Sequence, residues 1–258
     1  MTTLYHLHIP KTGGSYIENN LYQSGIKNIL VNNDPIKIYT GTDNLNFDYI
    51  DPYHIKTSSF IHGHFGIGPM LIMPEIKPFT TIRNPLNRVI SHFAMSYFPI
   101  KNSLIMDTFD SWVFDDSKDM MIKNNLQSMF LTNEMSKEFI DSNKDIKGSF
   151  EKEDMRTYWN SGFGINNIQP NIDKVRQTLS KMIILEKTEN MDIFMDKLYD
   201  YINKEFNCSL LYMKFPEPKI DRHSSGLSNF IRKNITKDQE NKIKEMNELD
   251  FEIWNSID

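Results

Sequence analysis

Residues 4–15 read Leu-Tyr-His-Leu-His-Ile-Pro-Lys-Thr-Gly-Gly-Ser, and this stretch decides the fold. Residues 4–9 favour a short buried strand that ends at Pro10, and Gly13 and Gly14 then favour a turn. Beyond the glycines, Ile17 and Leu21 are four residues apart, the spacing of one helical face, and Gly25 is a suitable helix end. The sequence therefore predicts a strand, a glycine loop and a helix.

Two further segments have the same strand-to-helix pattern. Residues 79–82 and 182–185 are candidates for buried strands, and an apolar helical pattern follows each of them. The predicted inward faces of these helices are Leu86, Val89, Ile90 and Phe93 in the first, and Ile193, Phe194, Leu198 and Ile202 in the second, which starts at residues 188–190. Strands that alternate with helices indicate an α/β fold with a mostly parallel central sheet flanked by helices.

The remaining segments are less regular. Residues 102–168 are polar and rich in methionine, and we expect patches of helix there. Residues 215–225 hold two prolines and two serines and are typical of a loop. Residues 236–254 predict a charged amphipathic helix whose inward side chains are Ile243, Met246 and Leu249. The length of 258 residues suits a single domain over residues 1–258.

Composition limits the function. The formal net charge of -5 argues against a bulk attraction for nucleic acid or anionic lipid, so an anionic ligand would need locally placed positive charge. Cys208 is the single cysteine, which excludes an intrachain disulfide and suits a reducing compartment. No stretch is long and apolar enough to span a bilayer, and the start does not read as a signal peptide because His6 and His8 interrupt its apolar run. These features favour a cytoplasmic location.

The glycine loop is a candidate phosphate cradle. A strand that turns through glycines into a helix presents free N–H groups and the positive end of the helix dipole. The residues of this candidate cradle are Lys11, Thr12, Gly13, Gly14, Ser15 and Tyr16. The glycines allow a phosphate to approach the backbone closely, the lysine adds positive charge, and the two hydroxyls and the Tyr16 N–H add hydrogen-bond donors. The loop is not a Walker A motif, because the G-x-x-x-x-G-K-[ST] spacing is missing. The alternative is an ordinary helix start with Lys11 at the surface.

A second candidate grip lies at residues 81–93. Arg83 follows the predicted strand, Pro85 suits the first helical turn, and Ser91 comes two turns later. A guanidinium and a hydroxyl can together hold one phosphate. The alternative is an arginine at the sheet edge and a solvated serine.

The two segments together resemble the sulfotransferases that use 3′-phosphoadenosine 5′-phosphosulfate (PAPS), in particular the membrane-type carbohydrate branch that includes heparan sulfate 2-O-sulfotransferase. The match lies in Pro10-Lys11-Thr12-Gly13-Gly14-Ser15 and in the RxPxxRxxSxF pattern of residues 83–93. The resemblance implies a P-loop-like sulfotransferase fold. It assigns Lys11, Thr12, Gly13, Gly14 and Ser15 to the 5′-phosphosulfate, and Arg83 and Ser91 to the 3′-phosphate.

The resemblance also implies a catalytic base. The 2-O-sulfotransferase branch carries a His-Gly-His segment between the two motifs, and His62-Gly63-His64 stands there. His64 is the first choice for the base and His62 the second, whereas His6, His8 and His92 are expected to be structural. A base that titrates near neutrality would take the proton of an acceptor hydroxyl, and Lys11 with the loop N–H groups would stabilise the leaving phosphate.

Other segments resemble the family less strongly. Residues 125–127 resemble a segment on the acceptor side, and residues 184–189 resemble a strand of the family. Arg222, His223 and Ser224 fall where the family closes a lid over the nucleotide, and Arg222 and Ser224 are assigned to nucleotide binding there. Residues 102–168 show little specific similarity and are expected to select the acceptor. Tyr158-Trp159 beside residues 162–164 suit either a sugar-stacking surface or a core.

The sequence therefore predicts sulfuryl transfer from PAPS to a hydroxyl, with PAP as product and a glycan or glycoside as the expected acceptor. No metal is expected, because the transferred group carries less charge than a phosphoryl group and carboxylates do not cluster. A phosphate-cradle kinase or nucleotidase and a nucleotide-binding module without catalysis are the alternatives. A lipid or a peptide tyrosine is an alternative acceptor, and the oligomeric state is open.

Overall fold

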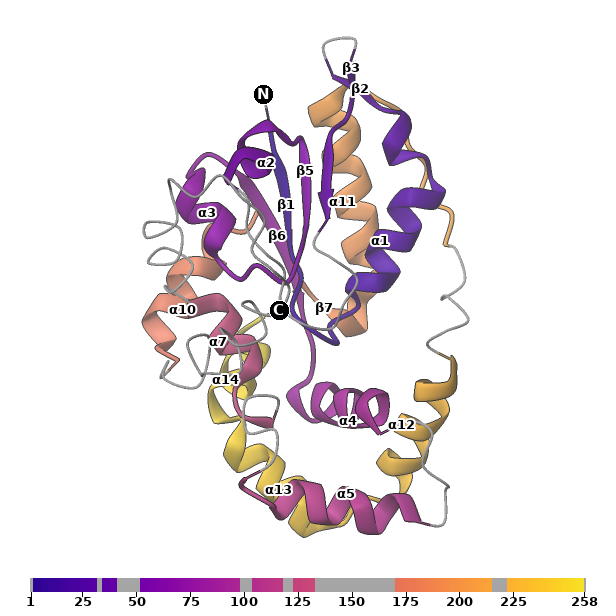
Figure 1. The fold of residues 1–258 in the computed structure, drawn as a ribbon, viewed down its shortest axis with the longest axis vertical. Helices are drawn as coiled ribbons and strands as arrows, with labels where there is room; N and C mark the ends of the chain where they lie inside the picture. The colour runs from indigo at the N-terminus through magenta and orange to yellow at the C-terminus, as the bar shows by residue number, and fades with distance from the viewer. Residues whose placement is uncertain are drawn as a thin grey trace.

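The computed structural model describes residues 2–31, 34–40, 52–97, 104–117, 123–132, 170–214 and 222–257. At its centre is a sheet of five strands, all parallel, in the order β4-β5-β1-β6-β7. The strands are β1 (Leu4–Leu7), β4 (Ile38–Thr40), β5 (Phe60–Gly63), β6 (Lys77–Ile82) and β7 (Ile184–Lys187). A separate antiparallel pair is β2 (Leu30–Val31) with β3 (Asp34–Pro35). The predicted α/β fold with a parallel sheet flanked by helices is confirmed (Figure 1).

The strand order has a switch point beside β1, the middle strand. From β1 the chain continues through α1 (Gly14–Gln23) toward β4 at one edge of the sheet. From β6 it continues through α4 (Pro85–Ser96) toward β7 at the other edge. Neighbouring strands β1 and β6 thus send their connections in opposite directions, and the carboxyl ends at such a switch point are where open parallel sheets usually have their ligand crevice. Both sequence motifs begin at this point.

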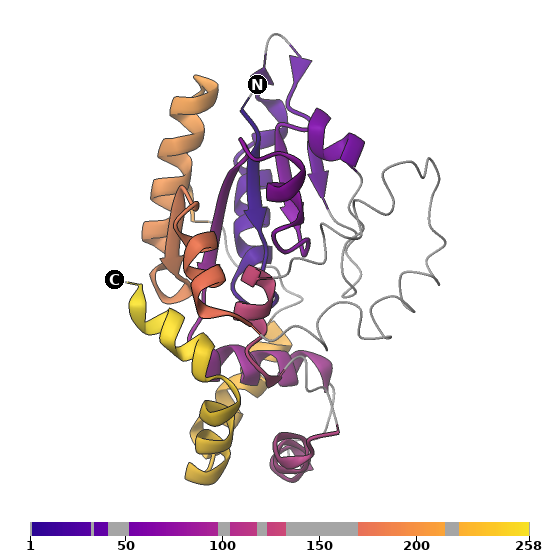
Figure 2. The ribbon, with the colours of Figure 1, turned by 90° about the vertical axis from the view of Figure 1, so that its left-hand side faces the viewer.

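Helices cover both faces of the sheet (Figures 1 and 2). On one face α1 and α11 (Met191–Phe206) pack against Leu4, Phe60 and Phe79. The other face is covered by α2 (Pro52–Thr57), α3 (Gly68–Ile72), α7 (Leu126–Thr132), α10 (Ile172–Leu179) and α14 (Glu248–Ser256). Short 3₁₀ turns lie at Ile26–Asn28 and Thr188–Asn190. Burial of these two apolar layers fixes the sheet from both sides.

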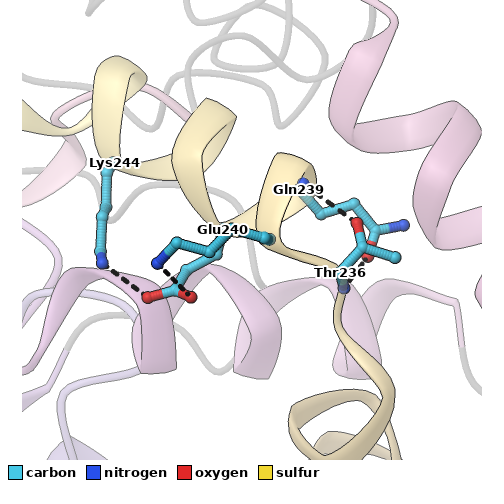
Figure 3. Close-up of polar contacts among 5 residues, drawn as sticks. Thr236, Gln239, Glu240 and Lys244 are labelled. Carbon is cyan, nitrogen blue, oxygen red and sulfur yellow. Dashed lines mark hydrogen bonds and ion pairs between the residues drawn. The ribbon is translucent and has the colours of Figure 1, made fainter.

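A third cluster lies below the carboxyl ends of the strands in Figure 1. It joins α4 to α5 (Ile105–Phe114), α12 (Arg222–Asn234) and α13 (Lys237–Met246). Helix α13 begins at a capping box: Thr236 Oγ1 accepts from Gln239 N at 3.2 Å and Gln239 Oε1 accepts from Thr236 N at 2.9 Å (Figure 3). Lys244 donates to Glu240 at 2.6 Å on the exposed side of the helix (Figure 3).

Three predicted boundaries differ from the structure. Strand β7 begins at Ile184 and extends to Lys187, two residues beyond the predicted end. The predicted loop over residues 215–225 is wrong from Arg222 onward, because Arg222 begins α12. The predicted helix over residues 236–254 is broken at Asn247, whose buried amide donates to Ile243 O at 2.8 Å and Lys123 O at 2.5 Å.

Two predicted inward positions also differ. Ile193 is 51% exposed, because the buried face of α11 follows Phe194, Leu198 and Ile202 and leaves the preceding residue outside. Leu249 is only half-buried, whereas its neighbour Asp250 is fully buried. Helices α5 and α7 confirm patches of helix within residues 102–168. Among the described residues, no helix has the length and apolar character that crossing a membrane requires.

Candidate functional site

The loop between β1 and α1 has an unusual backbone. Gly13 and Lys11 both have positive φ, 97° and 68°. Glycine adopts this conformation freely, but it costs lysine roughly 1–2 kcal/mol. Thr12 holds the turn by donating its N–H and its hydroxyl to Ile9 O at 3.3 and 2.9 Å. Such strain is typical of ligand-binding loops.

Neighbouring strand ends hold this loop from outside. The hydroxyls of Thr81 and Thr188 donate to Thr12 O at 2.6 and 2.9 Å. Arg83 Nη1 donates to Lys11 O at 2.9 Å. The two predicted phosphate grips are therefore in direct contact, and the loop is fixed without a ligand.

The N-terminus of α1 is open toward the crevice. Its N-cap, Gly13, makes no side-chain cap, and its first turn has no acidic residue. The first N–H groups of a helix lack acceptors within it, which leaves those of Gly14 and Ser15 available. Tyr16 N donates to Gly13 O at 3.0 Å, so this predicted donor is engaged within the turn. The Thr12 hydroxyl is likewise used inside the turn, whereas Ser15 is exposed.

The two loop glycines are also required by packing. A Cβ on Gly14 would lie 2.0 Å from His8 Nε2, and a Cβ on Gly13 would lie 2.4 Å from Met191 Cε. The imidazole of His8 therefore occupies the space beside the start of α1. The positive φ of Gly13 and the contact of Gly14 with His8 account for both glycines, so their presence does not by itself indicate a bound phosphate.

The turn after β6 is clamped by residues distant in sequence. Gln127 accepts from Arg83 N and donates to Arg83 O, both at 2.9 Å. Asp250 in turn accepts from the N–H groups of Gln127 and Ser128 at 3.0 and 2.7 Å, at the start of α7. Gln127 is fully buried, and its amide is engaged with the Arg83 backbone. The clamp fixes the backbone from which the Arg83 side chain extends.

Helix α4 brings a further polar stripe to the loop. Asn84 caps it by accepting from Asn87 N at 3.2 Å, and Ser91 lies at its largely buried side with 9% exposure. Arg88, His92 and Met95 share one face at helical spacing. Lys11 Nζ donates to Met95 Sδ at 3.5 Å, so the lysine side chain reaches over this face.

Four histidines form a cluster: His6 in β1, His62 in β5, and His8 and His64, which follow these two strands. The parallel register pairs His6 with His62. The His8 ring lies 5.4 Å from the His6 ring, 5.0 Å from the His62 ring and 4.3 Å from the His64 ring. His62 and His64 therefore point to one face, as predicted, and His8 links them to Gly14.

The contacts of His62 separate it from His64. His62 Nδ1 is 2.7 Å from His6 Nδ1, and His62 Nε2 is 3.5 Å from the Glu18 carboxylate. Because a carboxylate only accepts, the favoured tautomer of His62 carries its proton on Nε2 and accepts from His6 at Nδ1. Both nitrogens of His62 are then engaged. His64 is the better candidate for a base.

Burial keeps these imidazoles neutral. Burial lowers the pKa of His64 to about 4, and burial with the neighbouring His64 lowers the pKa of His62 to about 3. Burial and the neighbouring imidazoles also hold the pKa values of His6 and His8 well below the usual range. For His92, burial and then Arg88, Lys11 and His64 lower the pKa to about 3. A neutral imidazole at pH 7 can accept a proton, but the pKa of about 4 for His64 lies well below the near-neutral value expected of the base.

Comparison with known proteins adds no family assignment. No protein-family model matches this chain, and no curated protein matches it in sequence. The sulfotransferase resemblance therefore rests on the sequence motifs.

Several predicted positions lie outside the residues that the structure describes. The backbones of Arg222, His223 and Ser224 lie in the first turn of α12, but their side chains are outside the described residues. Residues 158–159 and 162–164, the predicted aromatic cluster, are also outside. Among the residues described, no three His, Cys, Asp or Glu side chains are arranged to hold one metal ion.

Sequence reasoning missed several residues of this site. His8 and His92 were expected to be structural, and the packing of His8 against Gly14 is such a role. That expectation did not place either imidazole near Lys11, whose positive charge acts on both. His8 lies three residues before Lys11, and His92 lies four after Arg88, so both spacings carry a signal. Gln127 and Asp250 are distant from either motif in sequence, and no local pattern marks them.

Proposed function

We propose that the protein is a PAPS-dependent sulfotransferase with a P-loop-like fold, acting on a hydroxyl of a carbohydrate acceptor. The contact between Arg83 Nη1 and Lys11 O, 2.9 Å, supports this most strongly, because it joins the two motifs at one crevice. Lys11, Ser15 and the N–H groups at the start of α1 would hold the 5′-phosphosulfate. Arg83 and Ser91 would hold the 3′-phosphate, with Arg222 and Ser224 as further candidates.

The proposed step is an in-line transfer. The acceptor oxygen forms a bond to sulfur while the bond from sulfur to the 5′-phosphate oxygen breaks. The hydroxyl proton passes to the neutral His64, and the electron pair of the broken bond stays on the phosphate of PAP. Lys11 and the helix N–H groups stabilise that developing negative charge.

The alternatives are a kinase-like enzyme and a nucleotide-binding module. Lys11 and Arg83 bring positive charge to the loop, with Arg88 nearby, and the carboxylate of Glu189 in the same region accepts from Asn84 N at 3.2 Å. Asp250, the buried carboxylate beside Arg88, is engaged by backbone N–H groups. This charge pattern suits a ligand that brings its own negative charge, and it favours sulfuryl transfer over a reaction that needs Mg²⁺ held by carboxylates.

The test is an acceptor screen with PAPS carrying heavy sulfur, read by mass spectrometry. We expect His64→Ala to lower kcat by roughly 10²- to 10⁴-fold while the affinity for PAP is kept. Lys11→Ala should weaken both PAP binding and turnover, and His54→Ala at an exposed position serves as the control. PAP binding without transfer to any acceptor would favour the binding module, and a fully active His64→Ala variant would refute the assignment of the base.

A further inference from the structure

His92 carries a buried polar atom with no partner. Its Nδ1 is inaccessible to solvent and makes no hydrogen bond within the described residues. Leaving such a group unpaired costs about 1–3 kcal/mol, so buried polar atoms are normally satisfied. A buried nitrogen left without a partner calls for an explanation, and a bound ligand is one.

The position of His92 points to the crevice. His92 lies one turn beyond Arg88 and one turn before Met95 on α4, and side chains at this spacing are neighbours. Lys11 Nζ contacts Met95 Sδ at 3.5 Å, so the amine of the loop lies along the same stripe. The unpartnered nitrogen is thus on the helix face that meets the phosphate loop.

The charges around His92 suit an anion. Arg88, Lys11 and His64 are the groups that act on this imidazole, and all three disfavour its protonated form. A neutral ring can still donate one N–H, and it does so without competing for the proton of an acceptor. An anionic oxygen is the partner that this surrounding favours.

We propose that His92 is a further active-site residue, whose Nδ1–H donates a hydrogen bond to a non-bridging oxygen of the sulfuryl group in transfer. The proposal rests on the proposed sulfotransferase function. Lys11, which would serve the leaving phosphate, and His64, which would serve the acceptor, are both close enough to act on the His92 imidazole, and the sulfuryl group is the part of PAPS that passes from one to the other. His92 keeps its protonation state throughout, so the balance of the transfer step is unchanged.

Three substitutions test this role. In His92→Asn an amide nitrogen can stand near the place of Nδ1, whereas in His92→Gln it reaches the place of Nε2, and His92→Ala removes both. We expect His92→Ala and His92→Gln to lower kcat by roughly 10²- to 10³-fold, the effect of removing one transition-state donor, and His92→Asn to recover activity to within about tenfold of wild type. PAP lacks the sulfuryl group, so its Kd by calorimetry should stay within about twofold.

The outcomes are distinguishable. A wild-type kcat in His92→Ala would overturn the proposal. Equal losses of kcat in all three variants, accompanied by a lower Tm, would indicate a structural role and would also overturn it. A tenfold weaker Kd for PAP would move His92 to a nucleotide phosphate and also overturn it. A wild-type protein that neither binds PAP nor transfers sulfur would remove the proposed function itself, and this proposal with it.

Discussion

Mild acid should destabilise this protein strongly, because five histidines are buried in neutral form. The pKa values of His62, His64 and His92 are lowered to about 3, 4 and 3, and those of His6 and His8 are held well below the usual range. In the unfolded chain each would titrate near about 6.5. Between these values the unfolded state binds more protons than the folded state, so the free energy of unfolding falls as the pH falls through about 6.5.

The size of the effect follows from this linkage. Lowering the pH from about 7.5 to about 5.5 stabilises the unfolded state by about 1.4 kcal/mol for each histidine that stays neutral when folded. Five such histidines give about 7 kcal/mol, which is comparable to the whole stability of a typical domain, about 5–15 kcal/mol. Below the folded pKa values the folded state also takes up protons, and the loss levels off.

Urea unfolding followed by circular dichroism at the two pH values measures this difference. His54→Gln, at an exposed position, should leave the difference unchanged. His92→Asn removes one of the five groups and should reduce the difference by about 1.4 kcal/mol. A wild-type difference below about 2 kcal/mol would refute the reasoning, since the imidazoles would then be protonated in the folded protein.

Three further predictions concern packing and caps. Gly14→Ala should destabilise the protein by about 1–3 kcal/mol because its Cβ meets the His8 ring, whereas Gly226→Ala should slightly stabilise it because nothing lies within 4 Å. The double variant His8→Ala/Gly14→Ala lacks the ring and should recover part of the loss. Thermal unfolding measures all three, and equal effects of Gly14→Ala and Gly226→Ala would contradict the contact with His8. Asp250→Asn should lower the free energy of unfolding by about 3 kcal/mol and weaken PAP binding, because it loosens α7 and with it the hold of Gln127 on Arg83. Unchanged stability together with an unchanged Kd for PAP would contradict this chain of contacts. Thr236→Ala should cost about 1 kcal/mol by removing the cap of α13 without affecting PAP binding, and a loss of binding would contradict the separation of that cap from the crevice.

The fold was predictable where local pattern and burial agree. The strand-loop-helix at residues 4–25, the strand before Arg83 and the helix after it follow from apolar spacing and from glycine and proline positions. Strand β4 was not predicted, because its residues Ile38–Thr40 are too few and only half-buried. The break at Asn247 depends on a distant contact with Lys123 O, which no local pattern contains.

The candidate site was predictable in part. The sequence identified Lys11, Arg83 and the pair His62 and His64, and the structure brings them to the same end of the sheet. It did not identify the clamp by Gln127 and Asp250, because Gln127 is 44 residues from Arg83 and Asp250 is 123 residues from Gln127. His62 differs from His64 because it contacts His6 and Glu18, and these contacts are visible only in the structure.

The central claim is that one site binds both the 5′-phosphate and the 3′-phosphate of the nucleotide. Calorimetry with PAP and with AMP, which differ only by that phosphate, tests it without knowledge of the acceptor. Wild-type protein should bind PAP roughly 10- to 150-fold more tightly than AMP, the equivalent of about 1.5–3 kcal/mol from charged hydrogen bonds, and the difference should largely vanish in Arg83→Ala. Equal affinity for PAP and AMP in the wild type, or a preference that survives Arg83→Ala together with Ser91→Ala, would contradict the account.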